Sequence, residues 1–237
     1  MGLFYSENLS SQNKQVLLGE EEGRHLQNVL RKKQGDSIQI TNGKGLLAEA
    51  LIVAGKTKSL VCDVQSLRHM PSPPERNIHI ALSTIRPNRL DWAVEKLTEL
   101  GVGSISFFHS QFTSVRAFKA DHLRKIAISA MKQSRQCFLP DINTPLPFSN
   151  WLQSLPKKGS QVRLLAHLED SSKDPRQVKW GEKSLVIAIG PEGGFSENEL
   201  TLATENKFVT VKIDNHILRT ETAAVTAASQ VKLLMRK

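Results

Sequence analysis

The second part of the chain alternates apolar runs with stretches of helical periodicity, and this alternation limits the folds open to it. The apolar runs, which predict strands, lie at residues 77–85, 104–108, 162–168, 184–189 and 208–213. Residues 88–100 and 121–137 carry apolar side chains three and four positions apart, which predicts helices between the first strands. Strands that alternate with helices in this way are typical of a parallel sheet. We therefore predict an α/β domain here.

The first 72 residues show a different pattern, and a proline-rich segment separates them from the rest. Residues 70–76 contain three prolines and a serine, which is typical of a linker. Before it, short alternating runs and the turn at residues 42–45 predict a β-rich unit, for which a small barrel is the expected form. We predict two domains, at residues 1–72 and 73–237.

Composition excludes several classes of protein. The 237 residues are 39% hydrophobic and 23% charged, which excludes intrinsic disorder for most of the chain. No apolar run approaches the roughly 20 residues that span a bilayer, and the first ten residues lack the pattern of a signal peptide. Two cysteines are too few for a disulfide framework or a cysteine-based zinc site. We expect a reduced, cytoplasmic protein with no membrane association.

Positive charge is concentrated in the second part of the chain. The 32 basic and 23 acidic side chains give a net charge of +9. Residues 86–135 alone contain nine basic and four acidic side chains. Such a cluster favours a polyanionic partner, most simply nucleic acid, although a solvated basic surface on an enzyme explains the charge equally well.

Two junctions between a predicted strand and a predicted helix carry the residues best suited to chemistry. The first, residues 189–196, has the sequence IGPEGGFS and leads into the capping pattern S-x-x-E at 196–199. Small residues let the backbone approach a ligand, and a helix start offers free amide groups. The spacing of these glycines matches neither the dinucleotide-binding motif G-x-G-x-x-G nor the nucleoside-triphosphate-binding motif G-x-x-x-x-G-K-[ST]. A tight turn without a ligand is the competing interpretation.

The second junction, residues 216–224, has the sequence HILRTETAA. Thr220 or Thr222 could cap the following helix, and Glu221 suits the positive end of its dipole, so a structural role explains three polar residues. Arg219 is not explained in this way, because a cation is unfavourable at a helix N-terminus. An anionic ligand or a developing negative charge would account for it. The seven histidines show no metal-binding spacing, and no serine-hydrolase elbow occurs.

Together the two junctions resemble the RsmE family of small-subunit ribosomal RNA methyltransferases. The motifs that carry the resemblance are Gly190-Pro-Glu-Gly-Gly-Phe195 and Leu218-Arg-Thr-Glu-Thr-Ala223, with similar stretches at residues 25–31, 95–102 and 131–134. The chain departs from the family pattern at Ser110-Gln111-Phe112, where Ser-Glu-Arg is common, and also at Pro87, Arg135-Gln136 and Asn215-His216.

The resemblance implies a fold, a reaction and partners. It implies a PUA-like RNA-binding β-barrel at residues 1–72 and a SPOUT α/β domain with a deep trefoil knot at residues 73–237. The implied reaction is methylation of uridine N3 in 16S ribosomal RNA by S-adenosylmethionine, without a metal, on the assembled small subunit and by a homodimer. The alternatives are a SPOUT enzyme that methylates another ribosomal or transfer RNA base, and a non-catalytic RNA-binding assembly factor.

The resemblance also implies site residues. The expected cofactor-binding residues are Leu165, Ala166, His167, Ile189, Gly190, Glu192, Gly193, Gly194, Ile213, Ile217, Leu218, Thr220 and Thr222. Arg219 is the expected catalytic cation that stabilises negative charge on the uracil oxygens. Glu221, with His216 as the alternative, is expected to accept the N3 proton. The expected RNA contacts are Arg24, Arg31, Arg86, Arg89 and Arg116.

Overall fold

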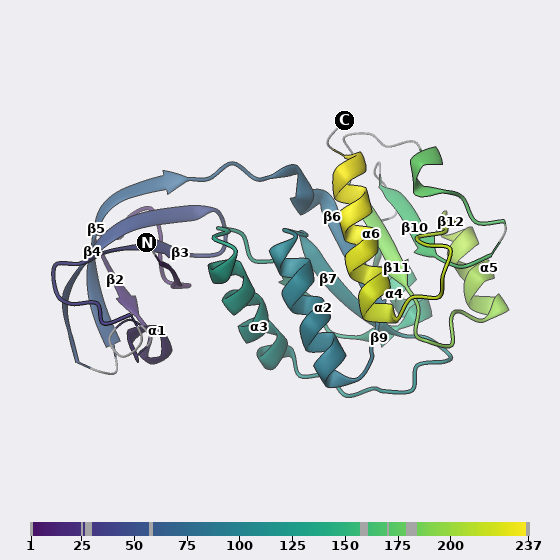
Figure 1. Cartoon of the computed structure of the whole chain (residues 1–237), viewed down its shortest axis with the longest axis horizontal. Helices are drawn as coiled ribbons and strands as arrows, with labels where there is room; N and C mark the ends of the chain where they lie inside the picture. The colour runs from purple at the N-terminus through teal and green to yellow at the C-terminus, as the bar shows by residue number, and fades with distance from the viewer. Residues whose placement is uncertain are drawn as a thin grey trace. The chain divides into compact units, whose positions relative to one another are not determined.

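The chain divides into two units in a computed structural model that describes residues 2–24, 26, 30–56, 59–156, 161–169, 171–178 and 184–235 (Figure 1). The first unit consists of Met1–Ser72 and Ile128–Leu139, and the second of Pro73–Ala127 and Pro140–Lys237. The predicted linker lies where the chain first passes between them. Residues 128–139 belong to the first unit, although the predicted boundary at residue 73 assigns them to the second domain.

The first unit is built on a five-stranded sheet with the order β1-β3-β4-β5-β2. Its strands are β1 (Leu3–Tyr5), β2 (Gln15–Leu18), β3 (Ser37–Thr41), β4 (Leu46–Lys56) and β5 (Ser59–His69), and the short helix α1 spans Glu20–Arg24. Alternate side chains such as Ile38 and Ile40 on β3 and Ala48 and Ala50 on β4 are fully buried. This alternation buries one face of β3 and of β4, as the sequence pattern predicted.

Residues 128–139 join the first unit through backbone contacts with the turn at residues 42–45. Leu139 N donates to Gly43 O at 2.8 Å, and Gly45 N donates to Cys137 O at 2.8 Å. Gly45 has a φ of +91°, and a Cβ atom there would lie 2.5 Å from the ring of Phe138. A glycine is therefore required at this position by both backbone conformation and space.

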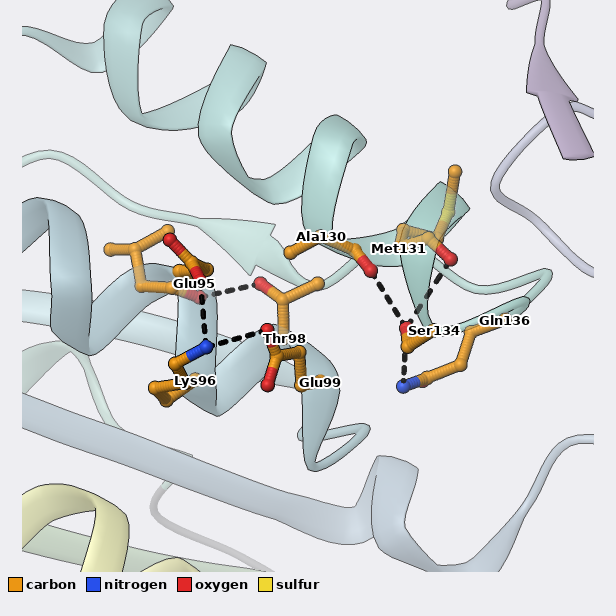
Figure 2. Close-up of polar contacts among 9 residues, drawn as sticks. Glu95, Lys96, Thr98, Glu99, Ala130, Met131, Ser134 and Gln136 are labelled. Atoms are coloured by element: carbon orange, nitrogen blue, oxygen red, sulfur yellow. Dashed lines mark hydrogen bonds and ion pairs between the residues drawn. The ribbon is translucent and has the colours of Figure 1, made fainter.

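Helix α3 (Ala120–Gln133) ends four residues before the limit that its apolar spacing predicted. The Ser134 hydroxyl donates to Ala130 O at 2.7 Å and accepts from Gln136 Nε2 at 3.1 Å (Figure 2). Arg135 then takes a φ of +56°, and Gln136 N donates to Met131 O at 3.0 Å. A left-handed residue of this kind terminates a helix, so the backbone ends α3 where side-chain periodicity continues.

The second unit contains a parallel sheet with the order β12-β10-β11-β6-β7-β8, with β9 also paired to β7. The strands are β6 (Ile78–Ser83), β7 (Ser104–His109), β8 (Asp141–Ile142), β9 (Leu146–Pro147), β10 (Val162–Ala166), β11 (Leu185–Ile189) and β12 (Val209–Val211). All of their pairings are parallel. Every residue of β11 is buried, as expected for a central strand covered on both faces. The predicted α/β domain is confirmed.

Helices of the second unit cover this sheet. They are α2 (Pro87–Glu99), the first half of α3, α4 (Phe148–Ser154), α5 (Glu197–Glu205) and α6 (Thr220–Leu234), with single turns at Pro74–Asn77 and Pro175–Gln177. Helices α2 and α6 pack side by side (Figure 1). On α2, Lys96 Nζ contacts Glu95 at 2.7 Å and Glu99 at 2.9 Å (Figure 2). Within the described ranges, no helix has both the length and the apolar character needed to cross a bilayer.

An aromatic cluster fixes α4 and the start of α5 on the sheet. The Phe148 ring lies 5.0 Å from that of Phe108 and 5.2 Å from that of Phe195, measured between centroids, and Trp151 and Phe208 extend the cluster. The sequence pattern does not predict α4, because seven residues are too few for a helical period to show. Burial of Phe148 and Trp151 accounts for this helix better than local propensity does.

We expect Phe148→Ala to lower the free energy of unfolding by about 3–5 kcal/mol, because it removes a buried ring from the centre of this cluster. Urea denaturation followed by circular dichroism measures the change. The matched control is Leu202→Ala on the exposed side of α5, which should stay within about 0.5 kcal/mol of the wild type. Equal stability of the two variants would contradict the role given to the cluster.

Candidate functional site

A pocket of about 420 Å³ lies at the carboxyl edge of the parallel sheet in the second unit. Three segments line it: the end of β10 with its loop, the loop after β11, and the loop that leads from β12 into α6. Because all the strands run in the same direction, their carboxyl ends meet at one edge, and the loops that follow them converge. This edge is where open α/β sheets bind ligands.

Most of the residues predicted to bind a cofactor line this pocket. They are Ala166, His167, Ile189, Gly190, Glu192, Gly193, Gly194, Ile213, Ile217, Leu218 and Thr220. Leu165 does not line it, because strand alternation turns its side chain into the buried core that contains Phe108 and Phe195. Thr222 does not line it either, since the next turn of α6 presents Ala223 instead.

Further residues that the sequence did not predict individually also line the pocket. They are Leu168, Pro191, Phe195, Asp214 and Ala223. Pro191 and Phe195 belong to the same loop motif, so the motif itself carried the signal for them. Asp214 and Leu168 lie within two residues of predicted pocket residues, and only the folded loops bring them to the cavity.

Close packing explains the glycines of the loop after β11. A Cβ atom at Gly190 would lie 2.9 Å from the Phe195 ring, and one at Gly193 would lie 2.9 Å from Cβ of Phe112. Gly194 has a φ of +72°, which side chains rarely adopt. The loop backbone is therefore fixed between two phenylalanines. This packing adds a structural requirement to the interpretation that glycine leaves room for a ligand.

The helix after this loop begins with the predicted capping box. Ser196 N donates to Glu199 Oε2 at 2.9 Å, and the Ser196 side chain accepts from Glu199 N. This prediction is confirmed. The start of α6 differs from its predicted form, because its N-cap is Arg219 and makes no side-chain capping bond.

Thr220 links the two junctions. Its buried hydroxyl donates to Gly190 O at 2.9 Å, so it ties the first turn of α6 to the loop after β11. The sequence offered helix capping as the structural role of Thr220, and the observed hydrogen bond replaces that role with a contact across 30 residues. The contact keeps two walls of the pocket together.

Glu221 is a buried carboxylate in the first turn of α6, with its side chain 9% exposed, and it is not among the residues that line the pocket. Its Oε1 atom lies 3.6 Å from Arg89 Nε, and its Oε2 atom has no hydrogen-bond partner among the described residues. Arg89 Nη1 also donates to Glu192 Oε1 at 2.6 Å. The Arg89 guanidinium therefore joins the first turn of α6 to the loop after β11. Because the positive charge of Arg89 is shared between Glu192 and Glu221, Arg89 is not a free cation available to a ligand.

Arg219 and His216 both line the pocket, but they differ in their polar contacts. In the part of the chain that the structure describes, no ion pair or hydrogen bond engages the Arg219 guanidinium, and this side chain is exposed. His216 Nδ1 lies 3.0 Å from Asp214 Oδ1, and the His216 backbone amide donates to the same oxygen. These contacts lower the pKa of Asp214 below its ordinary value.

The predicted RNA-binding arginines lie in both units. Arg86 and Arg116 are exposed and follow β6 and β7, so they lie at the same sheet edge as the pocket loops. Burial, with the charge of Arg116, lowers the pKa of His109. Arg24 and Arg31 lie in the first unit, where Arg24 pairs with Glu20 at 3.3 Å. Among the residues described, no three His, Cys, Asp or Glu side chains come together as a metal site.

Known proteins resemble this chain over nearly its whole length. A family model described as an RNA methyltransferase domain matches residues 72–232, and one described as an RNA methyltransferase PUA domain matches residues 18–65. Ribosomal RNA small subunit methyltransferase E of Rickettsia conorii is 26% identical over 98% of this chain and 95% of its own. The Bacillus subtilis protein of that name is 28% identical over 89% of this chain and 87% of its own.

Solved structures of proteins with similar names superpose on nearly the whole chain. A probable rRNA-methyltransferase from Porphyromonas gingivalis superposes with a TM-score of 0.91 at 32% identity, covering 100% of this chain and 99% of its own. Ribosomal RNA small subunit methyltransferase E from Neisseria gonorrhoeae, bound to S-adenosyl methionine, gives a TM-score of 0.89 at 28% identity and covers 99% and 98%.

We expect Thr220→Val to lower the free energy of unfolding by about 1–3 kcal/mol, because it leaves the Gly190 carbonyl without its buried donor. Urea denaturation measures this loss. Thr222→Val is the matched control, since the same change two residues away removes no hydrogen bond within the described part of the chain. A Thr220 variant as stable as the Thr222 variant would show that the link carries no stability.

Proposed function

This chain belongs to the RNA methyltransferase domain family, and we propose that it methylates N3 of a uridine in small-subunit ribosomal RNA with S-adenosylmethionine. Relatives named for small-subunit ribosomal RNA methylation support the substrate, and a neighbour solved with S-adenosyl methionine supports the cofactor. The observation that carries the proposal is the pocket at the sheet edge, where two loops far apart in sequence meet through Thr220 and Gly190.

The pocket suits a cofactor of this kind. Its volume of about 420 Å³ lies within the roughly 300–1,000 Å³ that is usual for small-molecule sites. Apolar side chains such as Ile189 and Leu218 line it together with the backbone of the glycine-rich loop. Backbone amides and carbonyls of that loop would bind the adenine, and the glycines keep this backbone accessible. When bound, S-adenosylmethionine supplies an electrophilic methyl group.

Arg219 is the proposed stabiliser of negative charge. Uridine N3 carries a proton and becomes a good nucleophile only as this proton leaves, which shifts negative charge to the uracil oxygens. A cation fixed near those oxygens lowers the barrier to this step. Arg219 lines the pocket, and no acidic side chain among the described residues neutralises it. This arrangement explains why a cation stands at the start of α6.

Glu221 is the proposed acceptor of the N3 proton. Its Oε2 atom is a buried acceptor without a hydrogen-bond partner in the described part of the chain, and such an atom favours any donor that reaches it. Arg89 Nε lies 3.6 Å from the other oxygen and stabilises the ionised carboxylate. His216, the alternative acceptor, is already engaged with Asp214 through Nδ1.

A direct assay tests the proposed reaction. Unmethylated small-subunit ribosomal RNA and assembled small subunits are each incubated with the protein and S-adenosylmethionine, and nucleosides are identified by mass spectrometry. We expect 3-methyluridine, with the assembled subunit as the better substrate. Another methylated nucleoside would replace the uridine assignment, and the absence of any product with both substrates would refute the methyltransferase proposal.

We also propose the finer architecture that the resemblance implies. The pocket segments that follow β11 and β12 would form a trefoil knot, which the Thr220–Gly190 contact supports by placing the start of α6 against the loop after β11. The first unit would be a PUA-like barrel, supported by the PUA family model at residues 18–65. With ribosomal RNA as substrate, the expected place of action is the cytoplasm.

A homodimer is part of this proposal. Ile217 and Leu233, just before and near the end of α6, are 87% and 70% exposed, and Trp92 on the neighbouring α2 is also exposed. Apolar side chains of this size favour burial against another surface. Sedimentation equilibrium measures the mass, and a purely monomeric protein at micromolar concentration would contradict a dimer.

Arg219→Ala is expected to lower kcat by roughly 10²–10³-fold, because a preorganised cation acts mainly on the transition state. Titration calorimetry should find the Kd for S-adenosylmethionine within about threefold of the wild type. Arg176→Ala, which removes an exposed arginine paired with Asp174 outside this pocket, is the matched control. Equal losses of rate and cofactor affinity in the Arg219 variant would refute this assignment.

Glu221→Gln is expected to lower kcat by roughly 10²–10⁴-fold while it preserves the shape of the side chain. Its Kd for S-adenosylmethionine should stay within about threefold of the wild type, because Glu221 does not line the cofactor pocket. Single-turnover methyl transfer and titration calorimetry measure the two effects. A variant with the wild-type rate would assign Glu221 to the support of Arg89 instead.

A further inference from the structure

Phe112 is an aromatic side chain at the edge of the site to which the proposed mechanism gives no role. It lies in the loop after β7 and is 46% exposed, whereas Phe107, Phe108, Phe148, Phe195 and Phe208 of the same unit are buried. Single exposed apolar side chains are common, so exposure alone carries no argument. The position of Phe112 against the glycine-rich loop is what distinguishes it.

Phe112 packs directly against Gly193. A Cβ atom on Gly193 would lie 2.9 Å from Cβ and 3.4 Å from Cγ of Phe112, so a side chain cannot replace the hydrogen there without displacing one of them. Gly193 also lines the pocket proposed to bind the cofactor. One peptide segment therefore separates the base of the Phe112 ring from the cavity in which the methyl group would be supplied.

The turn that carries Phe112 is fixed on both sides by hydrogen bonds. Ser110 N donates to Thr113 Oγ1 at 2.8 Å, and this hydroxyl shares a second hydrogen bond of 2.7 Å with Ser83 Oγ. Gln111 N donates to Glu199 Oε1 at 2.8 Å, which attaches the turn to the capping box of α5. An aromatic ring on a fixed turn loses little conformational entropy when a ligand covers it.

The surroundings favour a nucleic-acid ligand. Arg86 and Arg116 are exposed in the loops after β6 and β7, at the same sheet edge as Phe112. Cations and an exposed ring at one sheet edge suit a ligand that combines phosphates with flat bases. Enzymes that modify a base inside folded RNA must unstack it, and an aromatic side chain replaces the lost stacking.

We propose that Phe112 is a stacking platform for a nucleobase of the RNA substrate, beside the glycine-rich loop. The base lies on the exposed face of the ring, while Arg86 and Arg116 contact neighbouring phosphates. This inference rests on the proposed function, since the ligand it assigns is the RNA that the enzyme modifies. It adds a base-binding element that the cofactor loops and the catalytic residues do not supply.

The test compares four substitutions at one position. Phe112→Ala removes the ring, Phe112→Leu keeps an apolar contact without a π face, and Phe112→Tyr and Phe112→Trp keep the π face. Stacking on an aromatic side chain is lost in the first two, so the KM for small-subunit substrate should rise roughly 5- to 100-fold. The tyrosine and tryptophan variants should stay within about threefold of the wild type.

Two further measurements separate stacking from damage to the neighbouring loop. The Kd for S-adenosylmethionine, measured by titration calorimetry, should stay within about threefold in all four variants, because the ring does not line the cofactor pocket. Fluorescence anisotropy with a short oligouridine should show weaker binding for the alanine and leucine variants only. Leu202→Ala, another exposed apolar side chain of the same unit, is the matched control and should bind like the wild type.

Each outcome decides the proposal. Wild-type KM and oligouridine affinity in the alanine variant would overturn it, and so would a leucine variant that binds as well as phenylalanine, because an apolar contact would then suffice. A large loss of cofactor affinity in the alanine variant would assign Phe112 to loop support. If the wild type transfers no methyl group, the proposed function fails, and the oligouridine series still decides whether Phe112 stacks a base.

Discussion

Parallel pairing of the strands in the second unit is the constraint on which the site depends. Strands β10, β11, β6 and β7 are neighbours that run in one direction, so the loops after them converge at one edge. No single loop forms the pocket, and the residues that line it lie up to 57 positions apart between Ala166 and Ala223. The parallel direction of these strands therefore places residues from distant loops together at one ligand-binding edge.

The glycine-rich loop after β11 is held by contacts on several sides. Phe195 packs under Gly190 and belongs to the aromatic cluster that includes Phe148, while Phe112 packs against Gly193. Thr220 and Arg89 attach the same loop to the start of α6 and to α2. A backbone held from several directions can present its amides and carbonyls to a ligand with little reorganisation, which is what electrostatic preorganisation requires.

The arginines at this edge of the sheet differ in whether a carboxylate pairs with them. Arg89 is partly buried and shared between Glu192 and Glu221, so its charge mainly supports neighbouring groups. Arg219 lines the pocket, and no carboxylate in the described ranges pairs with it, so its charge is available to a ligand. The amino-acid composition does not distinguish these two arginines. Arg89 has carboxylate partners from distant parts of the chain, which gives it a supporting role, whereas Arg219, unpaired among the described residues, is the proposed catalytic cation.

The sequence by itself determined the alternation of strands and helices, the capping box at Ser196 and Glu199, and the two junctions that supply two of the three segments lining the pocket. These features depend on neighbours in the chain, whose spacing the sequence records directly. Only the tertiary structure decided that residues 128–139 join the first unit, that Leu165 faces the core, and that Arg89 is paired. Each of these three features depends on contacts between residues distant in sequence, such as the hydrogen bond between Leu139 and Gly43. Burial of the surface shared by such residues selects these contacts, and the local sequence pattern does not record it.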